Sequence, residues 1–208
     1  IAFLSREGLL LFNNVFLVVA AAAVLLGTLY PLALDAFGLG KISVGPPYFN
    51  AVFVPLTAPL VLLIGFAAAM PWKRGSAEVL RRLRTPAAAA VACGALLPLA
   101  YDTYSLTAAV GAMLGFWTLF ASLLDLALRG KSLSRSIAGM NLAHLGLGLF
   151  TIGVTVVSCY ASERDVRLTP GTSAMLGAYE FTLQSVTQRQ GPNYQAEQGT
   201  VVVEHRGS

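Results

Sequence analysis

The stretch Ile137–Tyr160, IAGMNLAHLGLGLFTIGVTVVSCY, decides the fold class of this sequence. It runs for 24 residues without a charged side chain, and about 20 apolar residues are enough to cross a bilayer as a helix. One histidine, His144, interrupts the run. Because a titratable side chain is costly at membrane depth, it usually faces a partner helix, a cavity or a metal. His144 is therefore either a hydrogen-bonded packing residue or a metal ligand, and the residue alone supports both interpretations equally.

The whole chain has the composition of a membrane protein. Hydrophobic residues make up 56% of its 208 residues and charged residues 12%, far from the balance of soluble domains. Five stretches are apolar enough to span a membrane, although the third is short. They are Gly8–Leu34, Phe49–Met70, Pro86–Tyr101, Leu106–Leu128 and Ile137–Tyr160. The first is too long for a cleaved signal peptide. We therefore expect a polytopic α-helical membrane protein in which residues 1–160 form a transmembrane bundle.

Basic residues and tyrosines predict the orientation of this bundle. With the amino terminus inside, the loops place one basic residue, Lys41, outside and nine on the cytoplasmic side. These nine are Arg6, Lys73, Arg74, Arg81, Arg82, Arg84, Arg129, Lys131 and Arg135. Five tyrosines mark the outer ends of the spans, namely Tyr30, Tyr48, Tyr101, Tyr104 and Tyr160, and Trp72 marks the inner interface. The net charge of +4 is thus a signal of topology, and nothing indicates a nucleic-acid partner.

The sequence changes character after Tyr160. Residues 161–208 carry four arginines and five acidic residues. Apolar Tyr179, Phe181 and Leu183 alternate with polar residues, which predicts a half-buried strand. We expect antiparallel strands at 165–168, 178–189 and 199–204, with a turn at 191–193. Because so few strands form a thin core, residues 161–208 are predicted to be a small, incomplete periplasmic β domain, and the chain to be truncated or partial.

Two polar pairs in the helical part have ordinary interpretations. Asn13 and Asn14 lie near the inner end of the first span, where interhelical hydrogen bonding or a role at the helix entry is favoured over a polar route or contact with a cofactor. Asp125 stands four residues before Arg129, which predicts an ion pair on the helix surface.

The remaining candidates are a loop, an acid and two thiols. The Lys41–Phe49 loop predicts a rigid outer hairpin, with re-entrant packing against a cofactor as the alternative. Asp102 is expected in a turn or as an N-cap. Cys93 and Cys159 fall at unequal depths in different spans, so two free thiols are expected. No zinc spacing, phosphate loop or Ser/His/Asp set is present in the sequence.

Several segments together resemble one family, the cytochrome c haem lyases of the CcmF type and their nitrite-reductase-associated relatives. The segments are Ser5-Arg6-Glu7, Leu11-Phe12-Asn13-Asn14, residues 41–50 (KISVGPPYFN), Asn141-Leu142-Ala143-His144-Leu145-Gly146, residues 163–168 (ERDVRL) and Gly191-Pro192-Asn193-Tyr194. They occur in one order along nearly the whole chain. The resemblance would make this chain the carboxy-terminal portion of a larger lyase.

The resemblance implies a reaction and a cofactor. The family attaches haem covalently to the cysteines of Cys-x-x-Cys-His motifs in apocytochromes, and holds a b-type haem in the membrane between two helix histidines. His144 matches the second of these histidines, whereas the first has no counterpart, because the only other histidine is His205 in the tail. The Trp-rich haem-binding segment and its flanking histidines are also missing; the chain has only Trp72 and Trp117. His144 is thus the expected cofactor-binding and metal-ligating residue, no catalytic residue is assigned, and the chain alone is an incomplete enzyme.

The partners implied are the remainder of the lyase in the same or a separate chain, apocytochrome c, a haem chaperone, a thiol-handling maturation subunit, membrane quinol and the lipid bilayer. The implied location is the bacterial inner membrane. The alternative is a non-catalytic membrane scaffold that docks cytochrome maturation partners, in which His144 makes a helix–helix hydrogen bond. A transporter half is disfavoured because no inverted repeat is visible.

Overall fold

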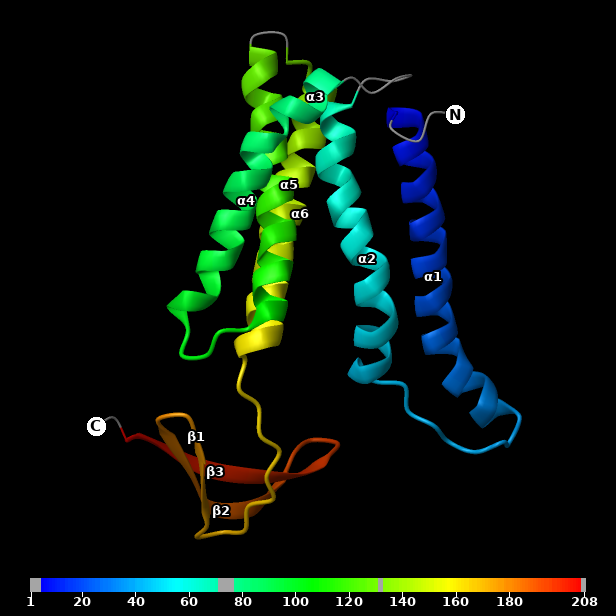
Figure 1. Cartoon of the computed structure of the whole chain (residues 1–208). Coiled ribbons are helices and arrows are strands. Elements are labelled where there is room, and N and C mark those ends of the chain that lie inside the picture. Colours follow the sequence, from blue (N-terminus) through cyan, green and yellow to red (C-terminus); the bar gives the residue numbers. More distant parts are fainter. Residues whose placement is uncertain (1–4, 71–76, 131–132, 207–208) are drawn as a thin grey trace. The chain divides into compact units, whose positions relative to one another are not determined.

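The computed structural model of the chain describes residues 5–70, 77–130 and 133–206, which belong to two compact units, Ile1–Cys159 and Tyr160–Ser208. The first unit is helical and the second is a small sheet (Figure 1). The elements of the helical unit are α1 (Arg6–Ala36), α2 (Pro46–Ala69), α3 (Ala77–Arg82), α4 (Arg84–Leu96), the 3-10 helix η1 (Leu97–Ala100), α5 (Leu106–Arg129) and α6 (Arg135–Tyr160).

The described residues contain five helices that are long and apolar enough to cross a membrane. Four of them, α1, α2, α5 and α6, begin and end within three residues of the predicted spans. The third differs, because its helical run covers Glu78–Ala100, 23 residues, and includes the short helix α3. Glu78 pairs there with Arg81 at 2.9 Å and Arg82 at 3.3 Å. Such i,i+3 and i,i+4 ion pairs stabilise a helix. The prediction began the span too late because it relied on apolar residues alone.

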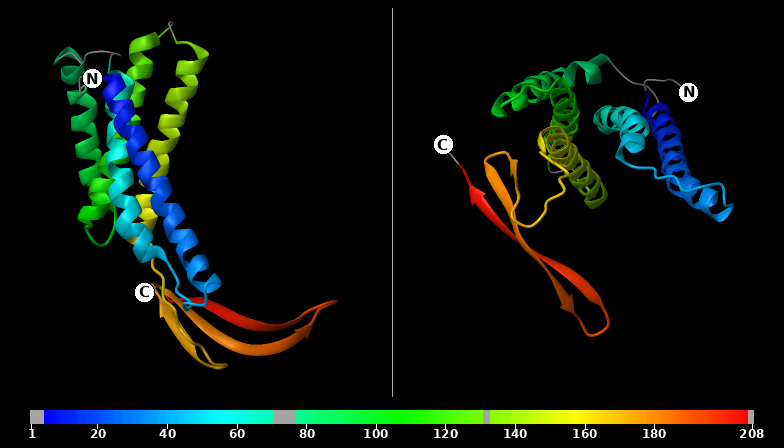
Figure 2. Two further views of the ribbon diagram at one scale, coloured as in Figure 1. Left: turned by 90° about the vertical axis from the view of Figure 1, so that its right-hand side faces the viewer. Right: turned by 90° about the horizontal axis from the view of Figure 1, so that it is seen from below.

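Helix α5 is the centre of the helical unit. Its Ala108, Ala109 and Ala112 are fully buried, and α4 approaches so closely that a Cβ on Gly94 would lie 2.6 Å from the Met113 backbone nitrogen. Small residues permit such close approach between helices in membranes. Figure 2 shows α4, α5 and α6 grouped together, with α1 and α2 as a neighbouring pair.

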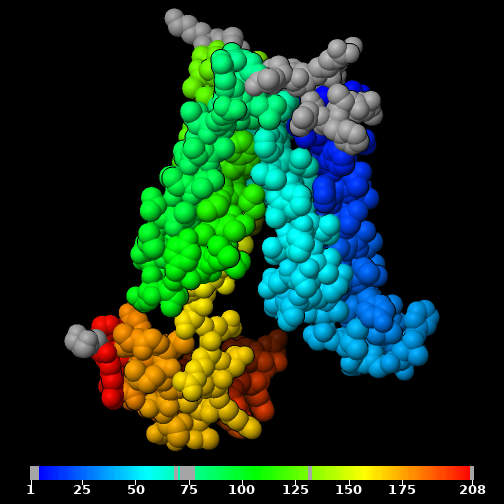
Figure 3. Space-filling view, viewed as in Figure 1, coloured from blue at the N-terminus to red at the C-terminus, as the bar shows by residue number. Residues whose placement is uncertain are grey.

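Two side chains of α5 tie it to α2. The Trp117 indole Nε1 donates to the Leu62 carbonyl at 2.9 Å, and the Thr118 hydroxyl donates to the Val61 carbonyl at 3.2 Å. Both acceptors lie in the second half of α2. Figure 3 shows that the first half of α2 diverges from the α4–α5 pair.

The predicted outer hairpin at 41–49 is partly wrong. Residues 37–45 are a loop, but α2 already begins at Pro46, because a proline fits the first helical turn, where its missing N–H costs nothing. Tyr48 therefore sits on a helix and donates its hydroxyl to the Ala23 carbonyl of α1 at 2.9 Å. The ring passes over Gly27, where a Cβ would come within 2.5 Å of it.

Asp102 lies in the short connection before α5, and only one of its two predicted roles is confirmed. Asp102 is exposed in a bend, as the turn prediction requires, and it is not an N-cap. Ser105 is the N-cap of α5, and its hydroxyl accepts from the Ala108 N–H at 3.2 Å. Cys93 and Cys159 are free thiols on α4 and α6.

The described basic residues of the helical unit, with the exception of Lys41, gather at one end of the bundle. This end holds the start of α1, α3, the start of α4, the end of α5 and the start of α6 (Figure 1). The loops that follow α1 and η1 lie at the opposite end, with Tyr101 and Tyr104. The arrangement agrees with the predicted orientation, which itself stays a prediction. Trp72, Lys73, Arg74 and Lys131 lie outside the described residues.

The second unit is a three-stranded antiparallel sheet in the order β1-β2-β3, with β1 at Ser173–Leu176, β2 at Tyr179–Gln190 and β3 at Gln195–His205. The second and third predicted strands and the Gly191-Pro192-Asn193 turn are confirmed. The strand predicted at 165–168 is wrong, because those residues are irregular and β1 lies after them. A two-residue connection, Gly177-Ala178, sets the register of β1 on β2, and Gly177 has φ +58°, a conformation that favours glycine.

The predicted apolar face of the sheet is confirmed. Phe181 stands opposite Ala174 of β1 and Val203 of β3, and Leu183 stands opposite Val201. Directly opposed residues share one face. Arg206 pairs with Glu180.

Candidate functional site

His144 lies on α6, nine residues after the helix begins at Arg135. Its side chain is half-buried and lines a cavity of about 320 Å³ between α1, α2 and α6. This volume is at the lower end of the range for small-molecule sites. The lining residues are Arg6, Leu9, Leu10 and Asn13 of α1, Leu63, Ile64 and Ala67 of α2, and Met140 and His144 of α6.

The imidazole of His144 has a nitrogen without a partner. Its Nδ1 is buried, and no hydrogen bond joins it to any atom of the described residues. A buried polar atom left unpaired costs about 1–3 kcal/mol. Among the residues that the structure describes, the helix–helix hydrogen bond that would make His144 a packing residue is thus absent. The geometry favours the ligand interpretation.

The walls of the cavity are mostly hydrocarbon. Leu9 is buried, and Leu10, Leu63, Ile64 and Ala67 complete the apolar lining. The polar lining consists of His144, Asn13 and Arg6, with the soft thioether of Met140 beside them. Imidazole is a common axial ligand of haem iron, and apolar walls with a few placed polar groups are typical of cofactor pockets. The residues present therefore fit one side of a haem.

His144 is the only histidine of the helical unit. No group of three or more His, Cys, Asp or Glu residues in the described part of the chain could hold a metal ion. An iron ion held by His144 would need a further ligand from outside the described residues.

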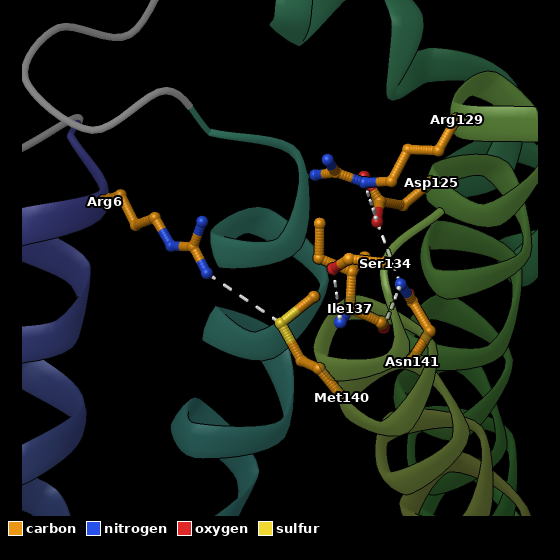
Figure 4. Close-up of polar contacts among 7 residues, drawn as sticks. All are labelled: Arg6, Asp125, Arg129, Ser134, Ile137, Met140 and Asn141. Carbon is orange, nitrogen blue, oxygen red and sulfur yellow. Dashed lines mark hydrogen bonds and ion pairs between the residues drawn. The ribbon is translucent and has the colours of Figure 1, made fainter. Parts of the chain in front are cut away.

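The opposite side of α6 carries a hydrogen-bonded contact through the Nδ2 of Asn141, whose Oδ1 has no hydrogen-bond partner among the described residues. Asn141 is fully buried and its Nδ2 donates to Asp125 Oδ2 on α5 at 2.9 Å and to the Ile137 carbonyl at 3.1 Å. Arg129 Nε donates to the same Asp125 oxygen at 2.8 Å. Figure 4 shows Asn141 turned to Asp125, and the neighbouring Met140 turned to Arg6 of α1. Successive residues of α6 thus serve two different interfaces.

The prediction for Asp125 is half right. The ion pair with Arg129 forms, but Asp125 is only 9% exposed, so it lies inside the bundle and not on the surface. Sequence spacing identified the i,i+4 partner and missed Asn141, which comes from another helix. The two asparagines of α1 also separate: Asn13 lines the cavity and Asn14 is exposed. No interhelical hydrogen bond of either one occurs among the described residues.

Arg6 and Met140 are site residues that sequence reasoning did not single out. Arg6 Nη2 lies 3.8 Å from Met140 Sδ, although 134 positions separate them in the chain. The available signal was the spacing of Arg6 and Asn13 on α1, seven residues and two turns apart, which places both on one face. Without the partner helices, that face could not be told from a lipid-facing one.

Comparisons with known proteins bear on the family of this chain. Residues 159–208 match the family model described as the CcmF C-terminal beta-sandwich. The cytochrome c-type biogenesis protein CcmF of Pseudomonas aeruginosa is 40% identical over 98% of this chain, and that of Escherichia coli is 37% identical over 98%. NrfE of Haemophilus influenzae is 32% identical over 94%.

A solved structure of a cytochrome c haem lyase CcmF superposes on the whole chain with a TM-score of 0.72 and 28% identity. The chain spans about a third of the length of these relatives, 32% of the Pseudomonas protein and 34% of the solved one. The similarity covers both units and is not confined to the sheet. This chain therefore belongs to the CcmF family of cytochrome c-type biogenesis proteins, of which it matches a carboxy-terminal portion.

Proposed function

We propose that this chain supplies one half of the membrane haem site of a cytochrome c haem lyase, with His144 as one axial ligand of a b-type haem. The second histidine comes from the remainder of the lyase, in the same or another chain. The observation that carries the proposal is the buried, unpartnered Nδ1 of His144 at the wall of an apolar cavity. When bound, the haem would supply one-electron redox chemistry.

The residues of the chain have distinct tasks at such a site. The neutral imidazole of His144 would hold the haem iron through a nitrogen lone pair. The leucines and Ile64 exclude water from the cavity, which lowers the local dielectric constant and strengthens polar contacts there. The Asp125–Asn141 hydrogen bond fixes α6 against α5 one turn before His144, so the imidazole is presented by a braced helix.

The depth of His144 in the membrane decides which electron donor could reach a haem bound there. It lies about 13 Å along α6 from Arg135, at a rise of 1.5 Å per residue. Arg135 belongs to the basic end of the bundle, which the positive-inside rule assigns to the cytoplasm. A haem held there is within reach of quinol in the inner membrane. The sheet would then lie in the periplasm, beside apocytochrome c, the haem chaperone and the thiol-handling subunit.

The alternative, a non-catalytic scaffold, gives His144 the task of a helix–helix hydrogen bond. Asn141 already performs that task on the α5 side of the helix. An optical spectrum separates the two functions: reduced-minus-oxidised difference bands of a low-spin, histidine-ligated haem are expected for the lyase and none for the scaffold.

The decisive variant is His144→Ala in the whole protein. We expect loss of the low-spin bands with normal insertion into the membrane, and recovery of the bands on addition of imidazole. His205→Ala is the matched control and should keep the wild-type spectrum. Unchanged haem content in His144→Ala would exclude His144 as a ligand.

A further inference from the structure

Three buried polar atoms of α5 and α6 have no hydrogen-bond partner among the described residues. They are Ser122 Oγ, Asn141 Oδ1 and His144 Nδ1. Ser122 and Asn141 are completely shielded from solvent, so the bulk water around the protein cannot satisfy their oxygens. A buried polar atom left unpaired costs free energy. The three atoms therefore need a common explanation if they lie close together.

Two contacts show how α5 and α6 are aligned. They are Leu119 against Gly148 and Asp125 against Asn141. The residue numbers rise along α5 as they fall along α6, so the two helices run antiparallel. Ser122 lies between the two contact residues of α5, and His144 lies between those of α6. Ser122 also follows Gly115, which touches α6, by two helical turns, so it faces α6 at the level of His144.

The two nitrogens of the His144 ring have different tasks. Nδ1 is buried, whereas the side chain as a whole is half-buried and lines the cavity between α1, α2 and α6. A nitrogen that is shut off from solvent cannot meet a ligand that enters this cavity. Nε2 is therefore the nitrogen left for iron, which it binds in its unprotonated form. Because a neutral imidazole carries one proton, that proton is on Nδ1 and needs an acceptor.

One water molecule would satisfy all three atoms. It would accept from the Nδ1–H of His144 and donate its two hydrogens to Asn141 Oδ1 and Ser122 Oγ. The Asn141 amide is oriented for this, because its Nδ2 already donates to Asp125 Oδ2 (Figure 4). The Ser122 hydroxyl keeps its own hydrogen for the carbonyl one turn earlier, a common bond of serines in helices. Buried waters typically make about three such bonds to groups that are otherwise unsatisfied.

We propose that Ser122 is a positioning residue which, with Asn141, holds a water molecule on Nδ1 of His144 and thereby presents Nε2 to the haem iron. This inference rests on the proposed function, because it takes His144 to be an iron ligand. A hydrogen bond accepted from the second ring nitrogen orients a ligating histidine and raises its basicity. A more basic ligand favours ferric over ferrous iron, so the water lowers the midpoint potential of the haem.

The test is Ser122→Ala in the whole protein, measured by haem titration and by an optical redox titration. We expect haem affinity to fall about 10- to 100-fold, the usual effect of losing such a partner, and the midpoint potential to rise. Thr118→Val is the matched control. It also removes a buried hydroxyl of α5, but one that is already bonded to the Val61 and Leu114 carbonyls. It should keep the wild-type affinity and potential.

Unchanged affinity and potential in Ser122→Ala overturn the proposal, as do equal changes in Thr118→Val. An experimental map of the haem-bound wild type tests the same claim without a variant. It should show a water within about 3.2 Å of His144 Nδ1, Ser122 Oγ and Asn141 Oδ1. A bond from Nδ1 to the iron, or to another residue of the lyase, overturns the proposal. In each of these cases His144-dependent low-spin bands leave the proposed function standing, whereas their absence in wild type removes that function and this inference with it.

Discussion

The two sides of α6 differ in how closely they pack against neighbouring helices. Toward α5, Asn141 is fully buried and its Nδ2 is hydrogen-bonded, although its Oδ1 is not. Gly148 lets the two helices touch, since a Cβ there would lie 2.9 Å from the Gly115 carbonyl. Toward α1 and α2, His144 leaves a buried nitrogen unpaired beside a cavity. The comparison teaches that one side fixes the helix so that the other side can hold a reactive group at a defined place, as a preorganised site requires.

The largest effect on the packed side is expected from Asp125→Ala. It leaves Arg129 without its carboxylate and removes one acceptor of Asn141. Removing one member of a buried pair costs about 3–5 kcal/mol; because Arg129 is 33% exposed, we expect roughly 2–4 kcal/mol. Thermal unfolding of the purified protein, followed by circular dichroism, measures the loss.

The same variant tests whether the two sides are separable. Haem bound to Asp125→Ala should keep its low-spin spectrum, with affinity lowered only as the braced helix loosens. The double variant Asp125→Ala/Arg129→Ala should be less destabilised than the sum of the two single variants, because they share one interaction. A stable Asp125→Ala protein without haem bands would instead place Asp125 in the haem site.

The two sides of α6 differ in how far the sequence predicted their contacts. The limits of α1, α2, α5 and α6 were predictable from the length of their apolar runs, and the Asp125–Arg129 pair was predictable because it is local. The Asn141–Asp125 bond joins two helices, and the cavity needs three, with Arg6 and Met140 134 positions apart. Neither contact follows from the hydrophobic periodicity of a helix. Periodicity predicts that the helix has a buried face, but not which residues of other helices contact that face.

The β unit shows the same limit on a smaller scale. The long strands β2 and β3 were predictable from alternation, since Phe181 and Leu183 lie in a repeat of period two. The four residues of β1 are too few for a pattern, and the strand was misplaced to 165–168. Gly177-Ala178 was the usable signal, because a glycine-led two-residue connection is typical of hairpins.

A medium effect is expected from Gly148→Ala, compared with Gly146→Ala on the same helix. At Gly148 the new methyl group would meet Leu119 Cγ at 2.8 Å and the Gly115 carbonyl, whereas nothing lies within 4 Å at Gly146. Overpacking should destabilise Gly148→Ala by about 1–3 kcal/mol. Gly146→Ala should be neutral or stabilising by up to about 1 kcal/mol, because alanine favours the helix. Equal shifts in the unfolding temperature of the two variants would show that α5 and α6 do not touch at Gly148.

The smallest effect is expected on the cavity side, from Asn13→Leu. Asn13 lines the cavity and bonds to no described residue, so its replacement should change the free energy of unfolding by no more than about 0.5 kcal/mol. Asn14→Leu, one position along and exposed, is the control and should be equally neutral. The two variants should differ instead in haem affinity, because only Asn13 faces the space where the ring would lie. If the free energy of unfolding fell by more than about 1 kcal/mol in Asn13→Leu alone, the Asn13 amide would have to form an interhelical hydrogen bond. The cavity side of α6 would then be packed through polar contacts, as the α5 side is.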